Sequence, residues 1–568
     1  MDAERLKRLL ESPERAKMTG WFDPRVLARS AVLVSLANVF GRNSDQRLIE
    51  ALANQPQTAF DYSKQGGNFW VDYVSDLGDG WNSTYAVAHA IAEPTLRVAP
   101  GVGASSEITH AGRVLIFGGD EVYPYPSRAA YEIHTEKPYA TAFSGRAHPD
   151  LFAVPGNHDW YDSLIAFSRT FCRPERGFAA CRTQQTRSYF ALRLPANWWL
   201  LAIDLQLGAD LDEPQIQYFE RVAETMEDDA RIVLCVPEPQ WVLESSYPKV
   251  PGLDDSALSF LQTKILKHPV DVFLAGDDHH YRRHANAQGV HKIVCGGGGA
   301  FLHPTHVPRH KTLPNGFVEQ TAFPSREKSR RLAWRNLRFA RLNPRFMWMP
   351  AVLYALSAWL ASANLRPPDL ESMWRALQSS ATAAIRDPFD GLWLLTFLTV
   401  FVFFTDTHST RYRLLGGLTH ASSHLLAAFA VGWLALLFTT RGLHLPYGHS
   451  GQLLLSGAIT FTVGGYIGAL IMGIYLLISV QLFGRHSEQA FSALRVEDYK
   501  SWLRMKIDAD GDLTIYAMGI ERVPRLWKRG GESTETLVSA DPRATVPHLI
   551  EKIVLPRKGK AVRPPSST

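Results

Sequence analysis

Cysteine is scarce in this sequence, and the few cysteines present form no recognisable motif. Four cysteines occur among 568 residues, and none lies in a CxxC pair or another zinc-binding spacing. A structural zinc module and a disulfide-stabilised secreted fold are therefore not expected. Cys172 and Cys181 are near enough in sequence to form a disulfide, but isolated buried thiols in a reducing compartment are the favoured interpretation.

The sequence also lacks a secretory signal and a strong excess of charge. Its N-terminus, MDAERLKRLLESPERAK, is charged and amphipathic with no apolar core behind it, unlike a signal peptide. The formal net charge is +5, and the excess is concentrated in one block at 326–345 instead of being spread over a surface. We therefore expect no nucleic-acid partner.

Nearly all the long apolar runs lie between residues 346 and 484. This shift in composition, in a chain too long for one core, divides the protein into soluble and membrane-bound parts. The expected segments are an N-terminal helical segment at 1–65, an α/β domain at 66–325, a basic juxtamembrane segment at 326–345, a transmembrane domain at 346–484, a C-terminal cytoplasmic β-hairpin region at 485–555 that packs on the α/β domain, and a disordered tail at 556–568. Within the first segment, residues 25–53 are expected to be helical.

About four membrane-spanning helices are predicted between 346 and 484. The apolar runs that predict them lie at 346–364, 389–405, 419–439 and 453–483. The second is short for a span, and the fourth is long enough to tilt or to bend at Gly464-Gly465. Eight basic residues precede the first run, namely Arg326, Lys328, Arg330, Arg331, Arg335, Arg338, Arg341 and Arg345. The positive-inside rule then places the soluble domain and the C-terminus in the cytoplasm, on an inner or plasma membrane.

Polar side chains follow several apolar strands of the α/β domain, at the point where each strand ends. The runs and their endings are VDYVSD (Asp76), LIFGGD (Asp120), LFAVPGNH (Asn157 and His158) and DVFLAGDDHH (Asp277 and His279). Alternation of such strands with helices predicts an α/β fold, in which the carboxyl ends of the strands present ligands along one edge. Four endings on Asp, Asn or His in one domain indicate a metal site.

The ordered motifs DLG (76–78), GDEVY (119–123), GNHD (156–159) and GDDHHY (276–281) resemble those of the calcineurin-like metallophosphoesterases. The DxG and GDxxY forms are most similar to those of purple acid phosphatases, and the resemblance covers about residues 68–300. It implies a four-layer αββα sandwich that holds two metal ions. By position, Asp76 and His279 would bind the first metal, Asp120 would bridge both metals, and Asn157 would bind the second. The resemblance also implies that His158 donates to the leaving-group oxygen or the phosphate.

Three positions depart from the family pattern. Gly78 stands where the DxH motif has a metal-binding His, and the resemblance implies that Tyr123 fills that vacancy. Asp277 replaces the first His of GHxH, and Glu238 stands near the expected place of another strand-end His; both would serve the second metal. A ligand set this rich in oxygen suits hard ions. A divalent or mixed-valence pair of manganese or iron is therefore favoured, with magnesium or zinc as alternatives.

Several other residues are candidates for binding. His280 and Tyr281 could hold phosphate or substrate, although a charged loop would explain them equally well. Residues 295–306, CGGGGAFLHPTH, could bring backbone amides to an anion. His420 and His424 lie four residues apart near the start of the third predicted span. They could form a metal or proton site in the membrane, but simple packing is favoured.

Together these features predict a membrane-anchored, metal-dependent phosphoesterase that hydrolyses a phosphomonoester or phosphodiester with a metal-activated hydroxide. Its expected partners are a phosphoester substrate, which could be lipid-linked, and membrane lipids; the oligomeric state is left open. The alternative is a non-catalytic sensor or transport-coupled membrane module that binds a phosphorylated ligand at a degenerate site. That alternative stands because each lost His could mark a retired metal position.

Overall fold

The structure, a computed structural model, describes residues 3–12, 14–40, 58–100, 105–205, 210–246, 257–309, 311–363, 365–405, 409–531 and 535–557. The chain divides into two compact units, a sandwich unit of residues 1–19, 29–329 and 495–568 and a helical unit of residues 20–28 and 330–494. Of the helix expected over 25–53, helix α2 covers Pro24–Phe40, whereas residues 41–53 lie outside the described part. Residues 558–568 of the predicted disordered tail also lie outside it.

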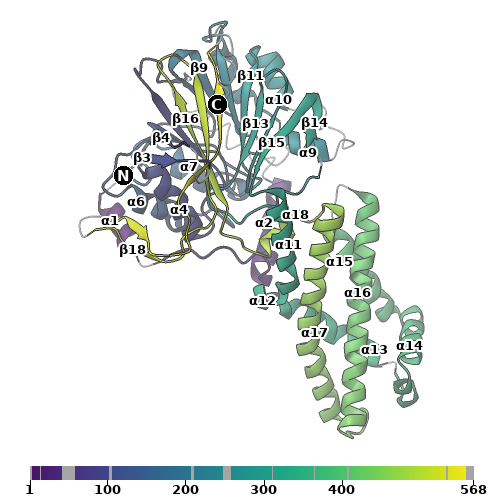
Figure 1. The fold of residues 1–568 in the computed structure, drawn as a ribbon. Helices are drawn as coiled ribbons and strands as arrows, with labels where there is room; N and C mark the ends of the chain where they lie inside the picture. Colours follow the sequence, from purple (N-terminus) through teal and green to yellow (C-terminus); the bar gives the residue numbers. More distant parts are fainter. Residues whose placement is uncertain are drawn as a thin grey trace. The chain divides into compact units, whose positions relative to one another are not determined.

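Two large sheets make up the sandwich unit, which confirms the mixed α/β class predicted from the sequence (Figure 1). The described strands of the nine-stranded sheet are, in spatial order, β1 (Phe60–Asp61), β8 (Phe190–Arg193), β9 (Trp198–Ala202), β10 (Arg231–Val236), β11 (Val270–Ala275), β13 (His291–Cys295), β12 (Tyr281–Ala285), β15 (Phe317–Phe323) and β14 (Thr312–Leu313). Those of the seven-stranded sheet are β20 (His548–Leu555), β17 (Leu513–Ile520), β16 (Lys500–Ile507), β2 (Phe69–Val74), β5 (Val114–Phe117), β6 (Asp150–Ala153) and β7 (Arg182–Thr183).

The alternation of side chains along β2 explains how the two sheets pack. Successive residues of a strand point to opposite faces. Phe69, Val71 and Tyr73 enter a core that also contains residues of the nine-stranded sheet, such as Leu200 and Val233. The two sheets therefore bury their inner faces against each other, and β2 is buried along its whole length because its other face is covered as well.

Helices cover the outer faces of both sheets. One core cluster joins the outer face of the seven-stranded sheet to α4, η2, α6 and α7, and another joins that of the nine-stranded sheet to α8, α9, α10 and η5. Their bounds are α4 (Trp81–Ala92), η2 (Tyr131–Glu136), α6 (Lys137–Phe143), α7 (Ile165–Phe171), α8 (Glu213–Ala223), α9 (Gln240–Ser246), α10 (Ala257–Phe260) and η5 (Leu261–Leu266). The shorter elements of the unit are α1 (Ala3–Glu11), α5 (Arg128–Ala130), η3 (Asp159–Asp162), η4 (Pro195–Asn197), η6 (Pro314–Gly316) and the two-stranded ribbons β3 (Thr95–Val98) with β4 (Glu107–His110) and β18 (Trp527–Arg529) with β19 (Leu537–Ser539).

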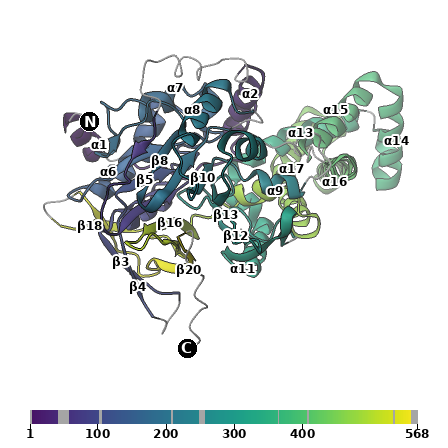
Figure 2. The same ribbon diagram turned by 90° about the horizontal axis from the view of Figure 1, so that it is seen from above.

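Strands from the C-terminal region are part of the same sheet as the first motif-bearing strand. β16 pairs antiparallel with β2, in a register that sets Leu503 opposite Tyr73 and Ile507 opposite Phe69. β17 and β20 extend the sheet beyond β16, and Figure 2 shows these yellow strands beside the dark strands from the early part of the chain. The sandwich is therefore completed only after the chain has passed through the helical unit.

The helical unit contains long apolar helices that pack on one another. Its described elements are η7 (Trp334–Arg338), α12 (Phe339–Leu342), η8 (Pro344–Met347), α13 (Trp348–Ala363), η9 (Pro367–Glu371), α14 (Met373–Arg386), α15 (Pro388–Phe404), α16 (Thr410–Leu437), η10 (Phe438–Gly442), α17 (Ser450–Ile478), η11 (Ser479–Phe483) and α18 (Ser487–Ser492), and α11 (Arg326–Ala333) leads into it. Of the basic block that precedes α13, Arg345 pairs with Asp23 at 2.6 Å, and Arg326 pairs with Glu319 of the sandwich unit.

Among the described residues, three helices are long and apolar enough to cross a membrane, and a fourth span is counted only if one bent helix pair forms a single crossing. The three helices are Pro344–Ala363, Thr410–Gly442 and Ser450–Phe483. The second predicted span, 389–405, corresponds to α15, which has only 17 residues. It meets the criterion only together with α14, across a bend of 98°. The difference from the predicted span arises because Asp387 and Pro388 end one helix and begin the next, with the Asp387 side chain capping α15.

The paired glycines of α17 serve packing and not the bend that the sequence suggested. α17 is one continuous helix from Ser450 to Ile478. A Cβ atom at Gly464 would lie 2.8 Å from Tyr354, and one at Gly468 would lie 2.3 Å from Pro350. Small residues on this face therefore let α17 approach α13 closely, as is common between membrane helices.

Candidate functional site

Three neighbouring parallel strands bring the first three motifs together. β5 lies between β2 and β6, and their last residues, Val74, Phe117 and Ala153, are in register. Asp76 and Asp120 follow two of these strands, both with the positive φ angles (60° and 54°) that L-residues seldom adopt. Such backbone conformations cost about 1–3 kcal/mol each and persist where the surroundings enforce them, often at functional sites.

The hydroxyl of Tyr123 lies at the centre of a cluster of acceptor atoms. It is 3.0 Å from Asp76 Oδ1, 3.0 Å from Asp120 Oδ2 and 3.0 Å from Nε2 of His279. All four side chains are buried. The single phenol proton can satisfy only one of these acceptors, so the cluster is short of positive charge. A cation bound here would supply it, and the mixed oxygen and imidazole set suits a transition metal.

His279 has the orientation of a metal-binding histidine. Its Nδ1 is 2.7 Å from the carbonyl oxygen of Phe301, so Nδ1–H donates to that oxygen and Nε2 keeps its lone pair. Metal-ligating histidines usually donate their other ring N–H in this way. His303 stacks on the ring at 3.8 Å and lies 3.7 Å from Asp278. Burial lowers the pKa of His279 to about 3, which keeps the imidazole neutral.

The pKa values of the carboxyl groups also indicate a site suited to a cation. Burial raises the pKa of Asp76 to about 7, although hydrogen bonds from Ser75 and Tyr123 oppose the shift. The pKa of Asp120 is raised well above its usual value, by burial first and then by the negative charges of Asp159 and Asp76. A bound metal ion reverses this electrostatic balance, because it favours the ionised carboxylates.

The residues expected at a second metal converge less completely. Oδ1 of Asn157 is buried without a hydrogen-bond partner, as expected of an atom meant for a ligand. The backbone N–H of Asp277 donates to both carboxylate oxygens of Asp76, at 3.1 and 3.0 Å. Glu238 follows β10, and burial raises its pKa to about 7. Within the described ranges, however, no three His, Cys, Asp or Glu side chains form a group that could hold a metal. The second-metal roles of Asp277 and Glu238 stay predictions.

His158 lies beside the acceptor cluster, held by its ring and its backbone. Its Nδ1 is 3.0 Å from the carbonyl oxygen of Pro124, and its backbone N–H donates to Asp120 Oδ1 at 2.8 Å. The ring packs against Tyr123 and Tyr161, with centroids 4.4 and 4.9 Å away. Burial lowers the pKa of His158 to about 3. The imidazole is therefore neutral, with Nδ1–H given to the carbonyl and Nε2 as an acceptor.

Asp159 positions the turn that carries Asn157 and His158. Its Oδ2 accepts the backbone N–H of Gly156 at 2.8 Å and that of Glu121 at 3.3 Å, and its Oδ1 accepts a short hydrogen bond from Tyr131. Asp159 thus ties the loop after β6 to the loop after β5.

Four glycines after β13 allow close packing around the site. Gly298 N–H donates to the carbonyl of Ser75 at 2.9 Å. A Cβ atom at Gly296 would lie 2.5 Å from Asp76 Oδ2, and one at Gly297 would lie 2.3 Å from Ser501 Oγ. The loop therefore lies against the end of β2 on one side and against β16 on the other, and only glycine leaves the room.

Lys500 is a buried residue near the site that the sequence analysis missed. It is fully buried, and its ammonium group donates to the carbonyl of Ala300. Burial lowers its pKa to about 8, although the surrounding carboxylates, including Asp79 and Asp76, oppose the shift. No local pattern identifies it, because it follows Asp76 by more than 400 residues in the sequence.

Tyr281 does not belong to the site, contrary to the prediction of substrate binding. Its side chain lies in the core between the two sheets, and its hydroxyl donates to Glu551 Oε1 at 2.7 Å. As the first residue of β12, it points to the inner face of the sheet. His280 is buried, and neither of its ring nitrogens has a partner in the described part of the chain; its role in substrate binding stays a prediction.

No family model matches the chain, and no curated protein matches it. Among solved structures, the chain is similar to GAP50, the anchor in the inner membrane complex of Plasmodium, with 13% identity, 44% of this chain and 77% of that chain covered, and a TM-score of 0.32. It is also similar to purple acid phosphatase PPD1 from yellow lupin seeds (13% identity, 46% and 48% covered, TM-score 0.30) and to PhoD (11% identity, 41% and 58% covered, TM-score 0.28). The match spans less than two thirds of the lupin enzyme and of PhoD. Scores this low carry no argument, and only the geometry of this chain's own residues supports a function.

Proposed function

We propose that this chain is a membrane-anchored metallophosphoesterase on a four-layer αββα sandwich. The proposed reaction is hydrolysis of a phosphomonoester or phosphodiester at the strand ends that carry Asp76, Asp120 and Asn157. Manganese or iron is the proposed metal pair, with magnesium or zinc as alternatives. The observation that carries the proposal is the single hydroxyl of Tyr123 at 3.0 Å from two carboxylate oxygens and one imidazole nitrogen.

The roles of the residues follow from their positions. When bound, the metal pair would supply positive charge to the phosphoryl oxygens and make bound water acidic enough to act as a nucleophile near neutral pH. Asp76, Tyr123 and His279 would hold the first ion, Asp120 would bridge, and Asn157 would complete the second position together with Asp277 and Glu238.

His158 would act on the substrate through Nε2. Because Nδ1–H is given to Pro124, the ring cannot turn without losing that bond. Before substrate arrives, the neutral ring can accept a hydrogen bond at Nε2. Negative charge on a bound phosphoester favours the imidazolium, so the ring can then hold a proton at Nε2 and pass it to the leaving-group oxygen.

A second candidate function is non-catalytic binding of a phosphorylated ligand, as a sensor or transport-coupled module. The observation in its favour is that, among the described residues, no three His, Cys, Asp or Glu side chains lie together at one metal position. In that case the Tyr123 hydroxyl would keep its hydrogen bond within the carboxylate cluster, with no metal to replace it. The two functions differ in turnover and in metal content.

Asn157→Ala is expected to lower metal affinity and phosphoesterase activity by about 10–100-fold, the usual cost of losing a group that supports a metal site. The measurement is the metal content of the purified full chain, alongside hydrolysis of a generic phosphodiester and phosphomonoester with Mn²⁺. Two metals per chain, with activity reduced in the variant, would support the enzyme and reveal the preferred ester.

The matched control is Asn286→Ala, since the Asn286 side chain only accepts backbone N–H groups in a surface turn. Loss of activity in this control would indicate general misfolding. No turnover and no metal in the wild-type chain would overturn the enzyme proposal and favour the binding module.

The pairing of β16 with β2 bears on the proposed membrane topology. These strands belong to one sheet, and a bilayer cannot divide a sheet. The chain segments before and after the helical unit therefore lie on one side, which requires an even number of crossings. We propose four, with α15 as a crossing of its own, because its 17 residues reach the lower limit of about 17–25 residues for a span. The basic block before α13 would make the shared side cytoplasmic.

Cysteine labelling is expected to place the two distal loops on one face and the sandwich unit on the other. The variants are Glu371→Cys at the last residue of η9, Ser450→Cys at the first residue of α17, and Ala540→Cys in the sandwich unit. All three positions are exposed, and the background is Cys172→Ser. Closed vesicles are treated with a membrane-impermeant maleimide, which reaches only the cysteines on the outer face. The first two variants should be labelled to the same extent, and Ala540→Cys should be labelled only in vesicles in which they are not. Labelling of Glu371→Cys together with Ala540→Cys would contradict four crossings.

A further inference from the structure

A row of hydrogen-bonded aromatic side chains runs through the interior of the helical unit. Nε2 of His424 is 3.1 Å from Nε2 of His420, and Nδ1 of His424 is 3.0 Å from the hydroxyl of Tyr354. Both histidines are almost fully buried, with 1% and 3% of their surface exposed. The pair lacks a third ligand, because the described residues contain no group of three metal-ligating side chains. A metal at this place is not supported.

The hydrogen bonds permit two arrangements of the protons, and each leaves one donor of the row without an acceptor. If the Tyr354 hydroxyl donates to Nδ1 of His424, then His424 Nε2–H donates to Nε2 of His420, and every donor of the row except the last has an acceptor. The opposite arrangement would leave the Tyr354 proton without one. The first arrangement leaves Nδ1–H of His420 as a donor, and Nδ1 has no partner in the described part of the chain.

The ring of His420 lines a groove between α16 and α17, with Nδ1 itself buried. The groove has a volume of about 510 Å³, and His420 lines it together with Tyr475, whose ring stacks on the imidazole at 3.8 Å. Its walls are otherwise mainly apolar, with Ile471, Ile474 and Leu415 among them. This volume lies within the range of about 300–1,000 Å³ of small-molecule pockets.

A cation stands at one end of the same groove. Arg411, in the first turn of α16, lines it and is exposed to solvent. His420 lies nine residues further along the helix, about 13 Å from Arg411 along the axis. The groove thus combines a positive charge at its end, a buried imidazole further along, and apolar walls.

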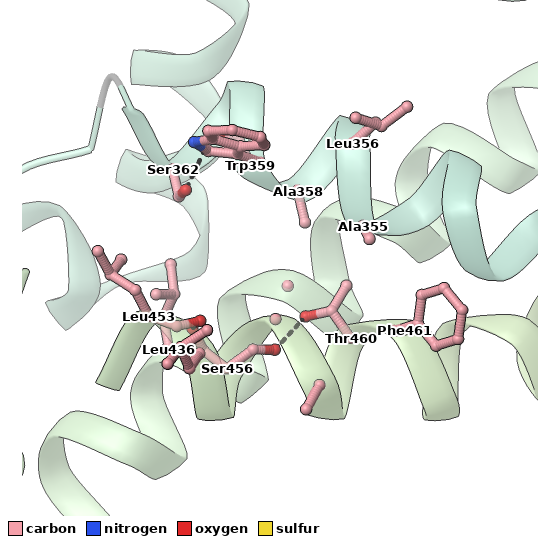
Figure 3. Close-up of a pocket in the computed structure, with 14 residues that line it drawn as sticks. Ala355, Leu356, Ala358, Trp359, Ser362, Leu436, Leu453, Ser456, Thr460 and Phe461 are labelled. Carbon is pink, nitrogen blue, oxygen red and sulfur yellow. Dashed lines mark hydrogen bonds between the residues drawn. The ribbon is translucent and has the colours of Figure 1, made fainter. Parts of the chain in front are cut away.

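A second groove of the helical unit lacks these features. Figure 3 shows it between α13 and α17, with a volume of about 570 Å³. Its hydroxyl groups donate within their own helices, from Ser362 to the Trp359 carbonyl, from Ser456 to that of Leu453 and from Thr460 to that of Ser456. None of its lining residues carries a charge. It therefore serves as an internal comparison.

We propose that the groove between α16 and α17 binds one anionic phospholipid. The phosphate pairs with Arg411, an ester carbonyl oxygen accepts from Nδ1–H of His420, and an acyl chain lies along Ile471 and Ile474. An ester oxygen accepts but cannot donate, so it would select the arrangement in which His420 carries its proton on Nδ1, and the phosphate matches the cation. The proposal rests on the membrane anchoring proposed above, but not on catalysis.

The test is lipid retention by the full chain, released from nanodiscs of equimolar phosphatidylglycerol and phosphatidylcholine and analysed by native mass spectrometry. One phosphatidylglycerol per chain is expected to be retained in preference to phosphatidylcholine. Arg411→Gln should lower that preference about five- to tenfold, since one cation near an anionic headgroup is worth about that much. Ile474→Trp should abolish retention because the indole fills the groove.

Matched controls lie on the same helices. Arg441→Gln removes an exposed charge from the other end of the α16 segment, and Leu454→Trp places an indole in the groove of Figure 3; both should retain the lipid. His420→Phe keeps an aromatic ring beside Tyr475 and should weaken retention of both lipids. Equal retention of the two lipids, or retention unchanged in Arg411→Gln, would mean only annular lipid and would overturn the proposal. Asn157→Ala should retain the lipid normally, so a failure here is distinguishable from a failure of the phosphoesterase assignment.

Discussion

Asp120→Asn is expected to lower kcat/KM for a soluble phosphodiester by about a thousandfold or more while the chain stays folded. The substitution preserves shape and most hydrogen bonds. An amide oxygen can still accept the His158 N–H, which is 2.8 Å from Oδ1, and the amide nitrogen can donate to the Tyr123 oxygen at 3.0 Å from Oδ2. What is lost is the negative charge and the lone pairs with which Asp120 would bridge two cations. Several kcal/mol of transition-state stabilisation depend on them.

Folding stability of the metal-free chain should change in the opposite direction. The pKa of Asp120 is raised well above its usual value by burial and by its acidic neighbours, so the folded chain is destabilised by this charge as pH rises above the usual carboxyl range. Asn removes that cost. A variant that is inactive but at least as stable as the wild type at neutral pH would separate a catalytic role from a structural one.

Asp150→Asn is the matched control for this prediction. Asp150 is also buried and accepts a hydrogen bond from Tyr62 at 2.9 Å, but it lies at the start of β6, away from the strand ends that carry the motifs. The activity of the Asp150→Asn variant should stay close to that of the wild type. If Asp120→Asn kept its activity within about tenfold of the wild type, the proposed bridging role of Asp120 would be wrong. A loss that small is no larger than the loss from removing a residue that only supports a metal ligand.

The part of the candidate site that could be predicted from the sequence is the part in which local structure sets the positions of the side chains. Asp76, Asp120 and Asn157 each follow a short apolar strand, and adjacent parallel strands bring such positions together whatever the rest of the fold. Tyr123 was found because it belongs to the same short motif as Asp120. These assignments needed only strand ends and spacing, and their roles in catalysis await the tests above.

Residues that depend on distant partners could not be predicted. β12, with the sequence YRRHA, looks like a charged loop, yet it is a strand whose Arg283 bonds Glu551 of β20 at 2.6 and 2.9 Å. The Tyr281 hydroxyl donates to the same Glu551 carboxylate, and this hydrogen bond satisfies the hydroxyl in the core. Lys500 likewise reaches the site only through the pairing of β16 with β2. Local sequence carries no trace of such contacts, since the partner lies hundreds of residues away.

Arg504→Met is expected to destabilise the sandwich unit by about 3–5 kcal/mol, the cost of leaving a buried charge without its partner. Arg504 and Asp72 are both buried, and the guanidinium bonds the carboxylate at 2.8 and 3.3 Å. It also donates to the carbonyl of Ile91 at 2.9 Å. The pair joins β16 to β2, so it ties the strands that follow the helical unit to the strand that carries the first motif.

The pH dependence of this loss is a sharper test than its size. Burial raises the pKa of Asp72, and the Arg504 charge opposes that shift. Without Arg504 the folded-state pKa rises further above the unfolded value, so the folded variant binds a proton that the unfolded chain releases. The deficit should therefore be small in acid and grow as pH rises through the folded-state pKa of Asp72. A deficit independent of pH would indicate lost packing instead.

Hydrogen exchange of β2 and β16 amides in the full chain is the suitable measurement, because it reports the sandwich unit even if the helical unit unfolds separately. Arg522→Met, at an exposed position, should cost less than about 0.5 kcal/mol. Asp72→Leu combined with Arg504→Met should recover much of the loss, since no charge is then buried alone. If the single variant cost under about 1 kcal/mol, the C-terminal strands would not depend on this pair. The pairing of β16 with β2 would then be held by its backbone hydrogen bonds and by apolar contacts.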